Sequence, residues 1–204
     1  YLQADKLSEA QMYAALAKKA NGKSALASVL EGDIAAKQKN AGLASQKYEE
    51  AIHFDSRCTP AYLKYADIYK SANAGLAIEK PNQLKTLEPS NTAIDKKLAE
   101  IYYLKNDFSK AADAYSRFAM GPTANEEDLV KYAFALFLNH DFAKSLEVAN
   151  MGLKKNPRHA AFNRLAMYNN TDLKRFEEAL KAADVFFNEC DKAVSYTHLT
   201  LPTN

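Results

Sequence analysis

The sequence predicts an all-α protein, a right-handed superhelical solenoid of antiparallel helix hairpins. Two observations support this fold class. Phe108, Phe142 and Phe176 are evenly spaced, in the similar strings DFSKAADAY, DFAKSLEVA and RFEEALKAA. The string NAGLA occurs twice, beginning at Asn40 and at Asn73. Self-similarity with a period of about 34 residues indicates stacked supersecondary units, each of which buries its apolar face against its neighbours.

The expected elements follow in chain order. An opening helix at about residues 4–19 is the second helix of a truncated repeat, and Gly22 ends it while Ser24 caps the next helix. Five hairpins then start near Ala25, Thr59, Thr92, Glu126 and Ala160.

Recurrent residues justify the individual hairpins. FDSRCTPAYLKYADIY from Phe54 and LEPSNTAIDKKLAEIY from Leu87 each run through a polar turn into a helix with a central small residue. In the later hairpins, a small residue follows the aromatic by three positions and lets two helices approach closely. These small residues are Ala111, Ser145 and Ala179. Pro122 and Pro157 lie in turns, where proline prevents a helix from continuing.

From Leu7 to Cys190, this pattern of small, aromatic and turn residues resembles the tetratricopeptide repeat family. The residue pattern suggests a bacterial source. The sequence departs from the family pattern at several points. It contains no tryptophan, and Ser28 and Asp95 replace common aromatics. Pro81 falls inside a second helix, where we expect a kink. In the last hairpin, we expect the first helix to be shifted by one residue relative to the first helices of the other hairpins.

We assign residues 1–193 to one repeat array. The final string, VSYTHLTLPTN at residues 194–204, has no helical period and resembles translated cloning sequence, so we expect a non-native or disordered tail. Neither end carries a polar cap, which leaves self-association through the ends possible.

Composition excludes several classes of function. The chain has 27 lysines and arginines against 25 acids, without the concentrated cationic face that nucleic-acid binding needs. No apolar run is long enough to span a membrane. Cys58 and Cys190 lie far apart and are expected to be free thiols. We expect a soluble protein of the bacterial cytoplasm or periplasm. The choice between these compartments stays open, because any signal peptide would precede Tyr1.

The chemical motifs favour structural roles, so we expect no enzyme, no cofactor and no metal. Residues 17–24, AKKANGKS, satisfy a relaxed phosphate-loop pattern, but an alanine-rich helix precedes them where a strand is required. The histidines are not spaced to place two ligands on one helical face. The triplet Asn169-Asn170-Thr171 fits a glycosylation site, a pattern that is common by chance.

The family resemblance implies a concave groove lined by the first helix of each hairpin. In one column we expect Asp33, Asp67, Glu100 and Phe134, followed by Met167. Lys70, Lys96, Tyr103 and Phe137 are expected beside this column. The groove would begin acidic and become aromatic, so a basic part of a partner would meet the acids and an apolar part the rings. The scarcity of inward bases argues against a receptor for carboxylate-ended chaperone tails.

We therefore predict a protein-interaction scaffold that holds a segment of another protein in this groove. Two alternatives stay open at this point. The chain could be a self-assembly module, or it could be the helper region of a longer enzyme or sensor.

Overall fold

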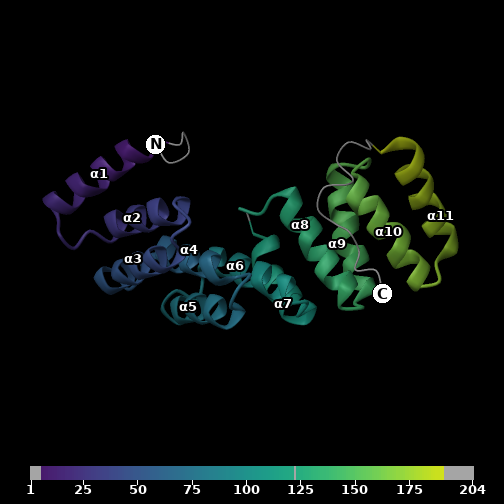
Figure 1. Cartoon of the computed structure of the whole chain (residues 1–204). Helices are drawn as coiled ribbons and strands as arrows, with labels where there is room; N and C mark the ends of the chain where they lie inside the picture. Colours follow the sequence, from purple (N-terminus) through teal and green to yellow (C-terminus); the bar gives the residue numbers. More distant parts are fainter. Residues whose placement is uncertain (1–5, 122, 191–204) are drawn as a thin grey trace. The chain divides into compact units, whose positions relative to one another are not determined.

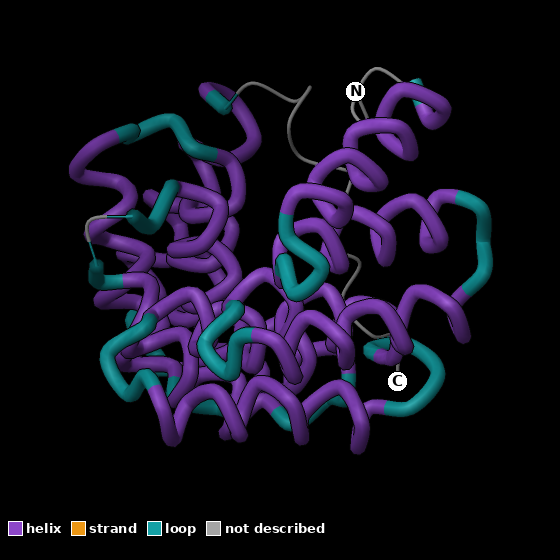
Figure 2. Tube along the Cα trace, turned by 90° about the vertical axis from the view of Figure 1, so that its left-hand side faces the viewer, coloured by secondary structure: helices purple, strands orange, loops and turns teal. Residues whose placement is uncertain are grey.

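The computed structural model of the chain describes residues 6–121 and 123–190. Every regular element in this part is helical, which confirms the predicted fold class (Figure 1). Figure 2 shows these helices joined by short loops, with no strand among the described residues. The predicted tail at 194–204 lies outside the described residues.

The chain forms two compact units, the first ending at Lys105 and the second beginning at Asn106. The helices of the first unit are α1 (Leu7–Ala20), α2 (Ala25–Lys37), α3 (Ala41–Phe54), α4 (Thr59–Tyr69), α5 (Ala74–Leu87) and α6 (Thr92–Leu104). Those of the second unit are α7 (Phe108–Ala119), α8 (Glu126–Leu138), α9 (Phe142–Lys155), α10 (Ala160–Asp172), α11 (Phe176–Asp184) and the π-helical turn η1 (Val185–Glu189).

Side-chain caps define most helix starts. Ser24 accepts a hydrogen bond from the amide of Ala27, as the sequence predicted. Asn125 and Asp128 form a complete capping box at the start of α8. Each of these contacts satisfies a backbone amide that has no partner inside its helix. Further helices are capped in the same way by Asn40, Asn73, Asn91, Asp107 and Asp141.

Four of the turns that join consecutive helices share one backbone conformation. Lys39, Asn106, His140 and Lys174 have φ values of 60°, 59°, 61° and 59°, in the left-handed region. The last three are spaced exactly as Phe108, Phe142 and Phe176 are, so the sequence repeat is also a repeat of backbone geometry.

Neighbouring helices meet through residues that lack bulky side chains. Ala44, Ala66, Ala77 and Ala99 are fully buried at these positions. Gly152 of α9 lies against the ring of Phe162 from α10, where a methyl group would overlap the ring. These contacts build each unit from pairs of adjacent helices.

Three of the departures from the family pattern, Pro81, Ser28 and Asp95, are accommodated locally. Pro81 is buried and α5 continues through it to Leu87. Ser28 is buried and its hydroxyl donates to the carbonyl of Ser24. Asp95 is buried and forms an ion pair with Lys85 of α5. A buried carboxylate without such a partner would be costly.

Candidate binding surface

The first predicted groove residue, Asp33 of α2, lies between two hydrogen-bond donors. It accepts a hydrogen bond of 2.9 Å from the Tyr48 hydroxyl of α3. Its other neighbour is Lys64 of α4, whose Nζ lies 2.8 Å from Oδ1. Burial and the Asp33 carboxylate together raise the pKa of Tyr48, so this phenol stays protonated and donates.

The same arrangement recurs one hairpin later. Lys97 of α6 donates to both carboxylate oxygens of Asp67 from α4, at 2.9 and 3.0 Å. Lys70 also contacts Asp67 at 2.9 Å, and Glu100 lies 3.3 Å from Lys97. Burial alone would raise the pKa of Asp67, but the hydrogen bonds from the two lysines outweigh it and lower this pKa. The predicted acids of the first unit are therefore already neutralised by lysines of the same unit.

We call the pairs Asp33–Lys64 and Asp67–Lys97 the charge ladder. In each pair an acid from the first helix of one hairpin meets a base from the first helix of the next. These helices also contact one another directly, α2 with α4 and α4 with α6.

The remaining predicted residues of the first unit surround this ladder. Lys96 and Tyr103 of α6 are half-buried. Burial raises the pKa of Tyr103, so this side chain is a neutral aromatic ring across the ordinary pH range. The side chain of Asp67 retains 39% of its exposure, so this rung of the ladder stays accessible to a partner.

In the second unit, the two predicted aromatic residues of α8 differ in exposure. Phe134 is only 1% exposed, and the guanidinium of Arg164 from α10 lies over its ring at 5.4 Å from the centroid. Phe137 is half-buried, with ring centroids 5.6 Å from Phe142 and 6.0 Å from Tyr168. Phe137 therefore offers ring surface that Phe134 does not.

Sequence reasoning missed two bases that pair with the predicted acids, Lys64 and Lys97. A signal for them exists, because a basic residue recurs at nearly the same interval in the first helices of successive hairpins. These bases are Lys64, Lys97, Lys131 and Arg164.

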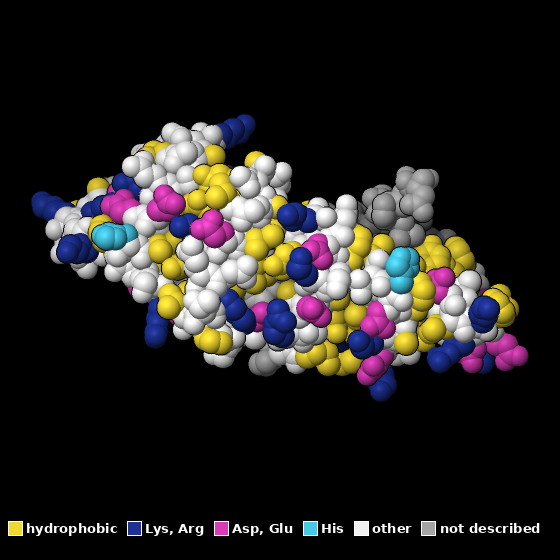
Figure 3. Space-filling model, turned by 90° about the horizontal axis from the view of Figure 1, so that it is seen from below, with side chains coloured by type: hydrophobic (Ala, Val, Ile, Leu, Met, Phe, Trp, Pro, Cys, Tyr) yellow, Lys and Arg dark blue, Asp and Glu magenta, His cyan; other side chains and the backbone are white. Residues whose placement is uncertain are grey.

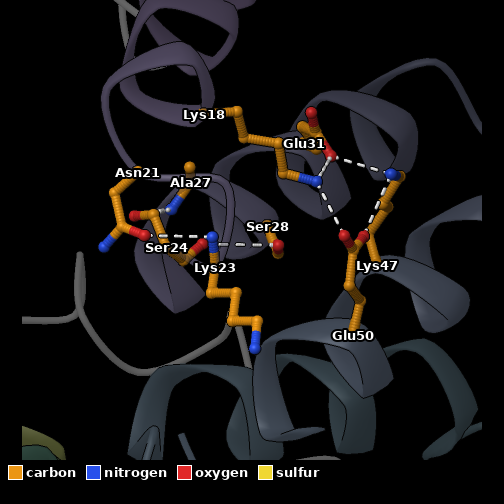
Figure 4. Close-up of polar contacts among 9 residues, drawn as sticks. All are labelled: Lys18, Asn21, Lys23, Ser24, Ala27, Ser28, Glu31, Lys47 and Glu50. Atoms are coloured by element: carbon orange, nitrogen blue, oxygen red, sulfur yellow. Dashed lines mark hydrogen bonds and ion pairs between the residues drawn. The ribbon is translucent and has the colours of Figure 1, made fainter. Parts of the chain in front are cut away.

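A second group of charges joins three helices of the first unit (Figure 4). Lys18 of α1 lies 2.8 Å from both Glu31 of α2 and Glu50 of α3, and Lys47 of α3 bridges the same two acids at 2.8 and 3.0 Å. Burial opposes ionisation of Glu31 and Glu50, but the lysine hydrogen bonds lower the pKa of both acids. We call these four residues the charge tetrad.

The segment that resembles a phosphate loop forms an ordinary inter-helix turn. Asn21 ends α1 and its side chain accepts from the amide of Lys23, while Ser24 caps α2 (Figure 4). The Asn21 side chain therefore takes up the amide of Lys23, one of the amides of this segment that a bound phosphate would need.

The acceptor residue of the glycosylation triplet, Asn169, is inaccessible in the folded chain. Asn169 is 0% exposed and donates a 2.8 Å hydrogen bond to the hydroxyl of Ser145, which in turn donates to the carbonyl of Ala133. Asn169 therefore forms a buried polar connection between α8, α9 and α10.

Neither a metal site nor a membrane span occurs in the described parts of the chain. Residues 6–121 and 123–190 contain no cluster of three side chains able to hold a metal ion. None of the helices in these ranges combines the length and the apolar character needed to cross a membrane. Acidic and basic side chains are intermingled on the face shown in Figure 3.

By sequence, the chain matches no protein-family model and no curated protein. By structure, it is similar to YrrB, described as a TPR protein with an unusual peptide-binding site, with a TM-score of 0.72 and 16% identity over 85% of this chain and 90% of YrrB. It is also similar to MamA, with a TM-score of 0.71 and 16% identity over 89% of this chain and 100% of MamA. PilF of Pseudomonas aeruginosa has a TM-score of 0.69 and 15% identity over 89% of this chain and 83% of PilF.

Proposed function

From the tetratricopeptide repeat fold of this chain, we propose a non-catalytic scaffold that binds a segment of another protein along the first helices of its hairpins. The observation that carries this proposal is the character of the side chains on these helices. The first unit carries partly exposed charge pairs, such as Asp67 with Lys97, and the second carries the half-buried ring of Phe137. An exposed ion pair contributes little to stability, so its charged side chains can exchange their present partners for charged groups of a bound segment at modest cost.

Two further facts support the proposal. The structurally similar protein YrrB is described as having a peptide-binding site. The relevant side chains also project from helices, which position a binding surface more rigidly than loops do.

A selection of random peptides on the full chain tests this function. We expect Asp67→Asn to weaken peptides that bind the first unit and Phe137→Ala to weaken peptides that bind the second, whereas Glu147→Ala on the exposed side of α9 should weaken neither. Circular dichroism melts should show that all three variants are folded. Peptides that bind every variant equally would place the interface elsewhere and contradict the proposal.

A second candidate function, self-assembly, is favoured by apolar side chains on the terminal helices. Leu16 of α1 is 53% exposed and Leu180 of α11 is 71% exposed. Such exposure can mark an interface. Sedimentation velocity over a range of concentrations separates the candidates. A mass that rises with concentration, and that Leu180→Glu returns to the monomer, would favour self-assembly over the peptide-binding scaffold.

A further inference from the structure

We propose that Arg164 binds a carboxylate side chain of the partner segment, and that an apolar side chain two residues away packs on Phe137 and Tyr168. This inference rests on the proposed scaffold function and gives the chemistry of its partner at the second unit. It also changes the charge expected in the partner. The sequence alone suggested a basic part that meets the acids, whereas Arg164 calls for an acidic residue.

The first argument comes from what each recurrent base contacts. Lys64 has Asp33 and Lys97 has Asp67, each in the preceding hairpin. Lys131 has Glu127 in its own helix, at 2.7 Å. Arg164 differs from all three, because the residue at the corresponding acidic position is Phe134.

The second argument comes from the surroundings of Arg164. Across residues 6–121 and 123–190, no carboxylate forms an ion pair with the guanidinium of Arg164, whose side chain is half-buried. Its Nε is buried, so a carboxylate of a partner would meet the terminal nitrogens of the guanidinium. A ring below a guanidinium gives attraction but accepts no conventional hydrogen bond from its N–H groups. A carboxylate supplies two oxygens in the planar geometry that a guanidinium matches.

The third argument concerns the side chains beside Arg164. Tyr168 follows it by one helical turn on α10, and the Tyr168 ring lies 6.0 Å from that of Phe137. Phe137, Arg164 and Tyr168 are all half-buried. A charged group therefore lies next to a partly exposed aromatic pair, which suits an acidic residue near an apolar one.

The spacing of these groups sets the spacing in the partner. One turn of α-helix separates Arg164 from Tyr168, which corresponds to about 6 Å along the helix axis. Alternate side chains of an extended segment point to the same side and lie about 6.7 Å apart. An extended partner therefore presents Asp or Glu at one position and Leu, Ile or Phe two positions away, on either side.

An array of immobilised peptides on the full chain tests this inference. Every peptide is acetylated and amidated, so that it carries no terminal charge. The array varies the two positions of the acid-any-apolar pattern and includes the reverse order. We expect this pattern to be enriched in one of its two orders on the parent chain, and binding to fall about tenfold when the acid is replaced by its amide.

Two variants and a matched control assign the effect to Arg164. Arg164→Gln should abolish the preference for an acid, and Arg164→Lys should weaken it, because lysine keeps the charge without the planar fork. Lys131→Gln removes a base that already has a carboxylate, so it should leave the preference unchanged. If the glutamine variant does not fold, the comparison of Arg164→Lys with Lys131→Gln decides.

The possible outcomes separate this inference from the proposed function. Peptide capture without any acidic preference, or with a preference that survives in Arg164→Gln, would overturn the inference and leave the scaffold intact. Binding only to peptides with a free C-terminal carboxylate would also overturn it. No capture of any peptide by the parent chain would contradict both.

Discussion

At the scale of single residues, the contact between Gly152 and Phe162 leaves no room for a methyl group. A Cβ at residue 152 would overlap several atoms of the Phe162 ring, which is itself fully buried in α10. Neither the ring nor the glycine backbone can move without disturbing the crossing of α9 and α10.

We therefore predict that Gly152→Ala destabilises the protein by about 2 kcal/mol or more, as expected for overpacking of a filled core. Gly42→Ala is the control, because its Cβ would meet only Asn40 Oδ1 at 3.9 Å. Thermal melts of both variants measure the effect. Equal melting temperatures for the two would contradict the packing of α9 on α10.

For the turn residues with left-handed backbone conformation, we predict that a substitution stabilises the protein. Lys174 has a φ of 59°, a conformation that costs a side-chain-bearing residue roughly 1 kcal/mol and costs glycine little. Lys174→Gly should therefore raise the melting temperature slightly, whereas Asn106→Gly should change it less, because asparagine already tolerates this region. Denaturant titrations of the two variants test the order.

Single residues also show what the sequence could and could not predict. The cap at Ser24 was predictable, because it depends on a polar side chain and the backbone three residues away. The burial of Phe134 was not, since it depends on Arg164 from a different hairpin. A column of equivalent positions does not reveal which side chain is covered by the next helix.

At the scale of helices, the charge tetrad holds α1 against α2 and α3. The apolar contact beneath it consists mainly of small or partly buried side chains, Ala10, Ala14, Leu30 and Ile34. We expect the tetrad to be a substantial part of what fixes α1, because such a contact buries little apolar surface.

The tetrad predicts a pH dependence in acid. The pKa values of Glu31 and Glu50 are lowered in the folded chain, so their stabilisation is present above the unfolded pKa of about 4.3 and is lost as pH falls through the lower folded values. The melting temperature should therefore drop more steeply below about pH 4 for the parent than for a variant carrying Glu31→Gln and Glu50→Gln.

Glu9→Gln provides the control for this experiment. Glu9 forms an exposed pair with Lys6 at 3.9 Å, so its removal should leave the acid limb of the curve unchanged. An identical acid limb for the parent and the double variant would show that the tetrad does not stabilise the fold.

Helix-scale features also divide into predictable and unpredictable ones. The sequence located helix starts because caps, prolines and polar turns are local signals. It identified the acids Asp33 and Asp67 but missed Lys64 and Lys97, since their role is defined only by the packing of one first helix on the next.

At the scale of the whole molecule, the sequence predicts one array over residues 1–193, and the described chain forms two compact units that meet in sequence at Lys105 and Asn106. The regular spacing of the repeat begins next to this point, at Phe108, and continues to Phe142 and Phe176. The division falls between α6 and α7, the two helices of the hairpin expected to start near Thr92, so the periodicity does not predict it.

Because the chain forms two compact units, we predict that a core substitution in one unit unfolds that unit locally. Ala111 of α7 is fully buried, so Ala111→Glu places a charge and extra volume inside the second unit and should cost several kcal/mol. Hydrogen exchange should accelerate in α7 to α11 and stay close to that of the parent in α1 to α4, because each repeat is stabilised by its neighbours. Equal acceleration in both units would instead show a single cooperative unfolding unit.

The charge ladder has a consequence for how such a chain can change in length. On α4, Lys64 faces back to Asp33 and Asp67 faces forward to Lys97, so one hairpin carries both a base for its predecessor and an acid for its successor. A duplicated copy of this hairpin would bring the complementary charge to both new junctions. Unequal recombination between neighbouring repeats could therefore lengthen the gene by one hairpin without requiring a second, compensating mutation.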